Sequence, residues 1–178
     1  MHHVKNRIFE YENRCFRATV LMYKDLKIFK ACITSIKEWA WWSFCKQAHV
    51  IVQKKARTVA RLLQGESCLL VDSNKITKNG VICRLCSSGQ PEDLAHLLFD
   101  CELFQELRNT LWTNVQSEAP FAMLTDTGLM SPWQRTVFLM SGLGGVFIPE
   151  WANLYDVVLE FIYRMYKCRL RQEELTQP

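Results

Sequence analysis

The chain has 178 residues, 49% apolar and 22% charged, which is enough apolar sequence for a core and argues against global disorder. Seven glycines and five prolines are too few for the many turns of a β-sandwich or barrel, so the composition favours helices. The start of the chain is polar and basic, and no apolar run is long enough to span a bilayer. We therefore expect an intracellular protein, nuclear or cytoplasmic, without membrane contact.

The formal net charge is +4, and the charged residues are distributed unevenly along the chain. Residues 1–65 carry 13 Lys and Arg against 4 Asp and Glu, whereas residues 66–160 carry 5 against 12. Residues 161–178 are again basic, with 4 against 2. A basic N-terminal part beside an acidic middle suggests that the N-terminal part meets a polyanion.

The first 45 residues predict helix followed by an aromatic cluster. Residues 13–36 place apolar side chains at helical spacing, either in one long helix or in two. Trp39, Trp41 and Trp42 follow, with lysines on both sides. These tryptophans are either a platform on which unpaired bases stack or core residues, and core packing is the more common role of such clusters.

Residues 47–64 predict a strong helix that ends at Gly65. Its apolar stripe repeats at i, i+4, i+7 and i+11: Val52, Ala56, Val59 and Leu63. Its cations at i, i+3 and i+7 align on one side: Lys54, Arg57 and Arg61. This row is either a set of contacts to successive phosphates or a solvated helix face.

The middle of the chain predicts a loop, a cysteine pair and two helices. Residues 66–82 predict a loop with at most two very short strands, followed by a turn over residues 87–91. Pro91 then predicts a helix start with acids in the first turn, with His96 on the helix and Cys101 near its end or just past it. The next helix carries a stripe from Phe104 to Val115.

The C-terminal part predicts a loop over residues 117–130 and two more helices. Ser131 and Pro132 predict a helix start, and this helix should end before Gly142. Residues 150–172 predict the last long helix, whose apolar stripe is Leu154, Val158, Phe161, Met165 and Cys168. Its basic end complements the helix C-terminus and is another candidate for nucleic-acid backbone contacts: Arg164, Lys167, Arg169 and Arg171.

The spacing C-x2-C-x9-H-x4-C predicts a metal site formed by Cys83, Cys86, His96 and Cys101. Two thiolates on a tight turn, with an imidazole and a third thiolate presented by a helix, can surround one tetrahedral zinc ion. Because four protein ligands close the coordination shell, we expect one structural Zn²⁺ rather than a catalytic one. The other cysteines lack ligand spacing and are expected to be small buried hydrophobes: Cys15, Cys32, Cys45, Cys68 and Cys168.

The residues around these ligands resemble the zinc-binding domain that follows the reverse transcriptase in non-LTR (LINE-type) retrotransposon polyproteins. The matching segments are Arg61-Leu-Leu-x-Gly65, Cys83-x-Leu-Cys86, Glu92-x3-His96-Leu-Leu-x2-Cys101 and Leu107-Arg108. The resemblance covers about residues 56–112. Arg84 stands where that family usually has proline, and Ser87 where it has glycine, so we expect a somewhat different knuckle turn.

The resemblance implies a non-catalytic module that helps a reverse transcriptase hold RNA or DNA. No pair of catalytic aspartates for two-metal chemistry and no Ser/His/Asp or Cys/His/Asn set is evident, so we expect no enzyme activity and no small-molecule substrate. Candidate nucleic-acid contacts are Lys54, Arg57, Arg61, Arg84 and Arg108. The alternative is a structural protein-interaction domain stapled by zinc, with the polymerase domain as a possible partner.

These predictions combine into a mainly α fold. We expect a helical bundle of five or six helices with a small CCHC zinc knuckle. The organisation would be a basic helical region (1–65), a zinc-binding region (66–116) and a C-terminal helical region (117–178), packed as one compact unit.

Overall fold

The structure is a computed structural model that describes residue 44, residues 50–63, residue 69, residues 81–144 and residues 148–176. The helices predicted over residues 13–36, the tryptophan cluster and the end of the helix at Gly65 lie outside the described residues. So do the first of the two predicted short strands, apart from Leu69, and the cysteines before Cys83.

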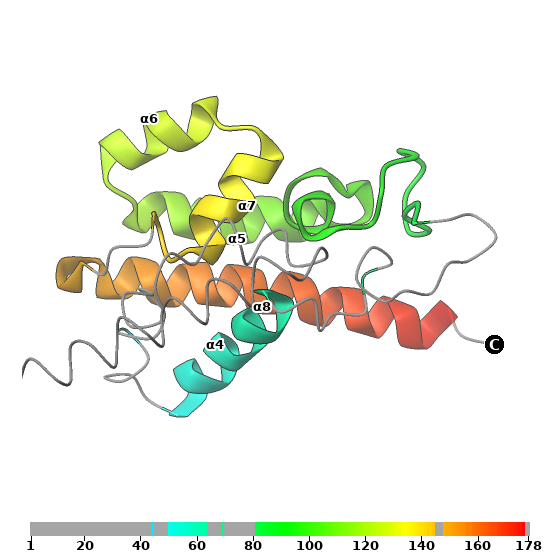
Figure 1. Ribbon diagram of the computed structural model, residues 1–178, viewed down its shortest axis with the longest axis horizontal. Coiled ribbons are helices and arrows are strands. Elements are labelled where there is room, and N and C mark those ends of the chain that lie inside the picture. Colours follow the sequence, from blue (N-terminus) through cyan, green and yellow to red (C-terminus); the bar gives the residue numbers. More distant parts are fainter. Residues whose placement is uncertain (1–43, 45–49, 64–68, 70–80, 145–147, 177–178) are drawn as a thin grey trace, which may run out of the picture.

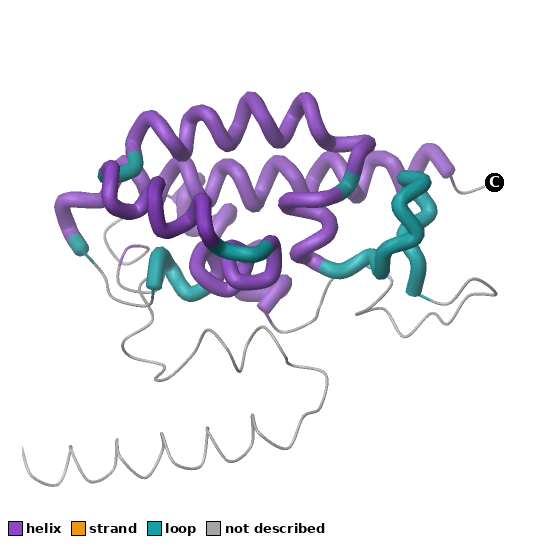
Figure 2. The backbone as a smooth tube through the Cα atoms, turned by 90° about the horizontal axis from the view of Figure 1, so that it is seen from above, coloured by secondary structure: helices purple, strands orange, loops and turns teal. Residues whose placement is uncertain are grey.

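The longest helix, α8 (Ala152–Thr176), lies at the centre of the described fold. Helix α5 (Gln105–Glu118) runs antiparallel beside it, and α4 (Val50–Leu63) crosses α8 on the other side, as Figures 1 and 2 show. Because α8 is covered from two directions, its buried apolar residues occupy more than one stripe. They are Leu154, Tyr155, Val158, Leu159, Phe161, Ile162 and Met165.

One hydrophobic core joins α8 to the other helices. Helix α4 buries Ala56, Val59, Leu62 and Leu63 in this core. The predicted stripe contains three of these residues but not Leu62, and its Val52 is partly buried. An aromatic group of Phe99, Trp112 and Phe161 links the segment His96–Asp100, α5 and α8 with ring centroids 5.5 to 6.0 Å apart. Aromatic contacts of this kind add to the stabilisation from burial alone.

Helices α6 (Phe121–Leu129) and α7 (Pro132–Met140) lie above α8 in Figure 1, and α7 contacts the segment His96–Asp100. The predicted start of α7 is confirmed, because Ser131 accepts a hydrogen bond from Gln134 N and the Gln134 side chain accepts one from Ser131 N. The predicted end before Gly142 is also confirmed.

The prediction of a loop over residues 117–130 is wrong, because α6 lies within it. Pro120 and Gly128 gave this segment the appearance of a turn region. Pro120 in fact precedes the first helical residue, where its missing N–H costs no helix hydrogen bond. Met123 and Thr127, one helical turn apart, are both buried, so tertiary packing stabilises a helix that intrinsic propensity alone does not favour.

The described residues contain no β-sheet, and the predicted mainly α fold is confirmed. The one isolated bridge among them pairs Ile82 with Pro91 in antiparallel orientation. Two 3₁₀ turns, η2 (Glu102–Phe104) and η3 (Pro149–Trp151), precede α5 and α8, and a π-helical turn, η1 (His96–Asp100), carries one of the predicted ligands. No helix in the described part of the chain combines the length and apolar character needed to cross a membrane.

Candidate metal centre

The first pair of predicted ligands lies in a loop closed by backbone hydrogen bonds. Cys83 N donates to Gln90 O at 2.9 Å and Glu92 N donates to Val81 O at 2.8 Å, so the two ends of the loop run side by side. Gly89 turns the chain with φ +70°, a conformation that glycine adopts without steric cost. The loop therefore makes its left-handed turn at Gly89, three residues after Cys86.

The second pair, His96 and Cys101, lies on and directly after a short helix that begins at Leu94. The prediction that this helix starts at Pro91 is wrong by three residues, because Pro91 pairs with Ile82 in the loop instead. Asp93 caps the helix: its carboxylate Oδ1 accepts a hydrogen bond from His96 N at 2.8 Å. The same hydrogen bond fixes the position of the His96 backbone.

A π-helical turn brings His96 and Cys101 together. In an α-helix, residues five apart point roughly 140° away from each other, since each residue advances the helix by about 100°. Here Cys101 N donates to His96 O at 2.7 Å, closing a wider turn of five residues. Cys101 then leaves the helix in extended conformation, so it lies just past the end of the helix, as predicted.

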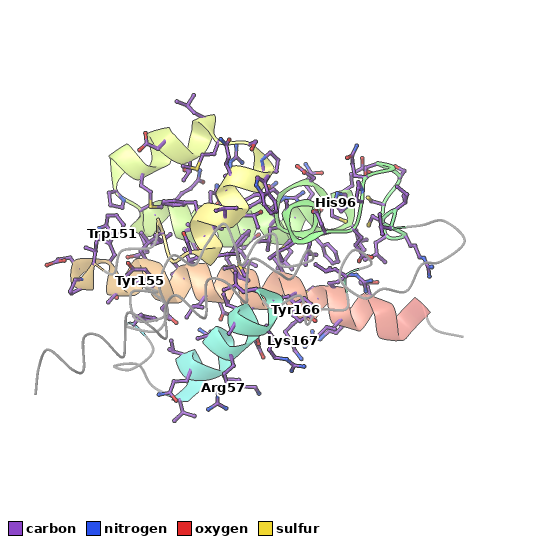
Figure 3. The ribbon with its side chains drawn as sticks, viewed as in Figure 1. Arg57, His96, Trp151, Tyr155, Tyr166 and Lys167 are labelled. Atoms are coloured by element: carbon purple, nitrogen blue, oxygen red, sulfur yellow. The ribbon has the colours of Figure 1, made fainter. Side chains whose placement is uncertain are left out.

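The four predicted ligands converge on one point. Their ligand atoms, the Sγ atoms of Cys83, Cys86 and Cys101 and a ring nitrogen of His96, all lie within 4.8 Å of one another. Cys86 Sγ is 3.3 Å from His96 Nε2, and a tetrahedral zinc ion would hold such a pair about 3.5 Å apart. The cluster can therefore hold a metal ion, and Figure 3 shows His96 on the helical turn beside the loop.

Burial makes this cluster costly to charge without a cation. Cys83, His96 and Cys101 are only 4%, 3% and 1% exposed, while Cys86 is half-buried at the rim. Burial, and then the neighbouring Cys83, raise the pKa of the Cys101 thiol to about 12. Burial also raises the pKa of Cys83. A bound cation would replace the protons and stabilise the thiolates.

Cys86 has a different environment from the buried thiols. Burial alone would raise its pKa, but hydrogen bonds from the side chain and backbone of Ser88 outweigh this effect and lower the pKa of Cys86. The Ser88 Oγ lies 3.1 Å from Cys86 Sγ. All the described cysteines, including Cys168, are free thiols, so none of them is committed to a disulfide.

Two polar contacts connect the residues around the ligands. Ser87 Oγ donates to Glu102 Oε2 at 3.1 Å, which joins the first ligand loop to the residue after the last ligand. Arg108 Nη2 donates to Cys101 O at 3.1 Å from α5. Burial lowers the pKa of Arg108, and the neighbouring Cys101 and Asp100 offset part of this effect. Such neighbours orient ligands and tune metal affinity.

A buried ion pair attaches the metal-binding segment to α8. Arg169 Nε donates to Glu92 Oε1, and the two side chains are 6% and 2% exposed. The Glu92 backbone closes the loop that carries Cys83, so this pair connects the loop to the central helix. Arg169 was predicted among the cations at the end of α8, but α8 continues to Thr176 and Arg169 points inward instead.

The structure places the predicted nucleic-acid contacts in two different environments. Lys54, Arg57 and Arg61 are exposed on α4, and Arg84 is exposed in the ligand loop. Arg108 is half-buried and bonded to the backbone of a ligand. The α4 row and the ligands were predicted as separate features, and they lie on separate elements.

Sequence reasoning missed the roles of Asp93, Glu92 and Arg169. Asp93 stands three residues before a ligand at a helix start, where a capping residue is expected, and this signal was available. Arg169 continues the buried series Val158, Ile162 and Met165 at i+11, which indicates an inward position. Glu92 carries no comparable signal, because its partner is 77 residues away.

Comparisons with known proteins add no relative for this chain. No family model, no curated protein and no solved structure matches it.

Proposed function

We propose that this chain is a non-catalytic zinc-binding module that helps to hold RNA or DNA, similar in role to the zinc-binding domain that follows the reverse transcriptase in non-LTR retrotransposons. The observation that carries the proposal is the convergence of Cys83, Cys86, His96 and Cys101 within 4.8 Å. These four residues are the same four that the resemblance implies as ligands.

The ligand set favours zinc. Three thiolates and one imidazole are soft and intermediate donors, which suit Zn²⁺ far better than Mg²⁺ or Ca²⁺. Four protein ligands leave no open position for water or substrate, so the ion would be structural. It would hold the ligand loop, in which Cys83 is the one buried residue of residues 81–90, to the turn at His96, which the core already holds through Leu97 and Leu98.

The nucleic-acid part of the proposal is supported by charge. The described α4 contains four cations and no acid, and three of the cations, Lys54, Arg57 and Arg61, are exposed. Cations that line one side of a helix can neutralise successive phosphates without reading the bases. The ligand region is acidic, so we assign the contact to α4 and a shaping role to the metal.

Metal content tests the first part of the proposal. Protein purified without chelator should contain about one equivalent of zinc by elemental analysis and native mass spectrometry. Cys83→Ser should lose the metal, whereas Cys168→Ser, which removes a half-buried thiol outside the cluster, should keep it. Retention of zinc by Cys83→Ser, or a metal-free wild type, would contradict the proposed centre.

Binding of labelled oligouridylate tests the second part. The affinity of the wild type should fall steeply with salt, because binding releases counterions from the nucleic acid. The triple variant Lys54→Glu, Arg57→Glu, Arg61→Glu should lose binding while its circular dichroism and zinc content stay unchanged. Unchanged binding would sink the nucleic-acid role and favour a zinc-stapled interaction domain.

A further inference from the structure

Helix α8 separates its C-terminal cations into inward and outward positions. Arg169 is buried in the ion pair with Glu92, whereas Arg164, Lys167 and Arg171 are exposed. The three exposed cations stand at i, i+3 and i+7, a spacing that aligns them on one side of a helix. Lys54, Arg57 and Arg61 show the same spacing on α4.

The outward row of α8 continues the face of that helix that meets α4. Lys55 of α4 donates to Asp156 at 3.2 Å and is 2.9 Å from Glu160 on α8. Positions 156, 160, 164, 167 and 171 follow one another at intervals of four or three residues, so they lie along one stripe. Between positions 164 and 171, beyond the crossing with α4, this stripe is therefore basic.

Two acids beside this surface, Asp156 and Glu160, are already engaged. Lys55 pairs with Asp156 and Glu160, and Arg164 is 2.8 Å from Glu160 across one helical turn. Figure 3 shows Arg57 of α4 and Lys167 of α8 on the same side of α8, opposite α6 and α7. The local field between the two rows is therefore dominated by the cations rather than by these carboxylates.

The distribution of exposed cations points to one composite surface. Among the described residues, seven Lys and Arg side chains are exposed, and six of these lie on α4 and α8. The seventh is Arg84 in the ligand loop. The other four described cations are at least partly buried: Lys55, Arg108, Arg135 and Arg169.

We infer that α8 provides a second half of the nucleic-acid surface, so that a phosphate backbone contacts the rows of both α4 and α8. This inference rests on the proposed function and extends it to Arg164, Lys167 and Arg171. Four of the six cations are arginines, whose planar guanidinium groups bind phosphate in bidentate fashion.

A lipid surface fits these rows less well than a nucleic acid does. Membrane-binding helices combine cations with exposed apolar side chains that insert into the bilayer. None of the exposed large apolar side chains of the described residues lies on α8, and those of α4 are confined to Val50 and Ile51 at its first turn. The composite surface is therefore suited to phosphates in solution.

The test compares two triple variants of the zinc-loaded protein. In one, Arg164, Lys167 and Arg171 are each changed to Gln; in the other, Lys54, Arg57 and Arg61 are each changed to Gln. Fluorescence anisotropy with oligouridylate about 20 nucleotides long measures affinity at several salt concentrations. Each variant should bind about tenfold or more weakly, and its salt slope should fall by roughly 2, because three single-strand contacts are lost.

A matched control separates local contacts from net charge. Asn109→Asp, Asn114→Asp and Gln116→Glu together change the net charge by the same three units at exposed positions of α5. This control should bind within about twofold of the wild type, since α5 carries neither row. A loss in the control equal to that of the α8 variant would overturn the inference.

The outcomes distinguish the inference from the proposed function. If the α4 variant loses affinity and the α8 variant does not, the composite surface is wrong and the α4 contact stands. If the wild type itself shows no salt-dependent binding, the proposed function fails first. Vesicles containing phosphatidylserine test the alternative partner, a membrane surface. The choice of nucleic acid would be overturned if the protein bound these vesicles through both rows and bound neither RNA nor DNA.

Discussion

The ion pair between Arg169 and Glu92 leads to the sharpest prediction about stability. Arg169→Met removes the charge and keeps most of the volume, but it leaves the Glu92 carboxylate in a site where its side chain is only 2% exposed. Breaking a buried pair by removing one partner costs about 3–5 kcal/mol, because the remaining charge is unpaired and desolvated. For a chain of this size, each kcal/mol lowers Tm by roughly 2–4 °C.

The expected result is therefore a fall in Tm of roughly 6–20 °C for zinc-saturated Arg169→Met. The free energy of unfolding, from urea titration followed by circular dichroism, should fall by about 3–5 kcal/mol. Glu92→Met combined with Arg169→Met should recover most of this loss, because two apolar side chains can replace a buried pair at little cost.

A control on the same helix makes the prediction discriminating. Arg164 also pairs with an acid, Glu160, at 2.8 Å, but the two side chains are 58% and 34% exposed. Arg164→Met should therefore cost no more than about 1 kcal/mol. If Arg169→Met costs as little as Arg164→Met, or if the double variant is no more stable than the single one, the argument from burial is refuted.

Two further predictions concern Arg108 and Lys55. Arg108→Met should weaken zinc binding by about tenfold or more in competition with a chromophoric chelator, because the donor to Cys101 O is lost, and an unchanged affinity would remove Arg108 from the centre. Burial lowers the pKa of Lys55, but hydrogen bonds to Glu160 and Asp156 outweigh this effect and raise it above its ordinary value of 10.5. Because the folded-state pKa is raised, the stabilisation is complete below pH 10.5 and is lost as pH rises through the folded-state pKa. Urea titrations of wild type and Lys55→Met should therefore differ at pH 8 and converge under strongly alkaline conditions; a constant difference would contradict this pairing.

The cluster that can hold a metal ion could be predicted from the sequence because its four residues are local. Cys83 to Cys101 is a short segment, and within it a turn and one helix decide where the donors lie. Residue type and spacing therefore carry nearly all the information. The π-helical turn was not predicted, because the spacing of the ligands in the sequence does not distinguish a π turn from an α-helix.

The helices could be predicted where a stripe and a cap agree. Ser131 and Pro132 define the start of α7, and the stripe from Val52 to Leu63 defines α4. Helix α6 lacks both signals, and its stability depends on burying Met123 and Thr127 against residues distant in sequence. Contacts of this kind have no local pattern, so periodicity alone cannot identify them.

The buried polar contacts were the least predictable features of the chain. Arg169 belongs to a basic stretch, and local composition suggests that all its members face solvent. The helix period contradicts this for Arg169 alone, because it follows Met165 by one turn on the buried side. Only the fold reveals that Glu92 stands opposite, and a buried arginine needs such a partner.

Helix α8 connects the two halves of the proposed function. Its inward Arg169 holds the loop that carries Cys83, through Glu92, and its outward row continues the basic surface of α4. A metal that fixes the ligand loop would therefore also fix the partner of Arg169, and with it the last turns of α8. Under the proposed function, zinc would contribute to nucleic-acid binding without touching the nucleic acid. Removal of zinc should then weaken binding mainly through the α8 row, and an α8 triple variant should be less sensitive to chelator than the wild type. Equal sensitivity of the two proteins would separate the metal centre from the α8 surface.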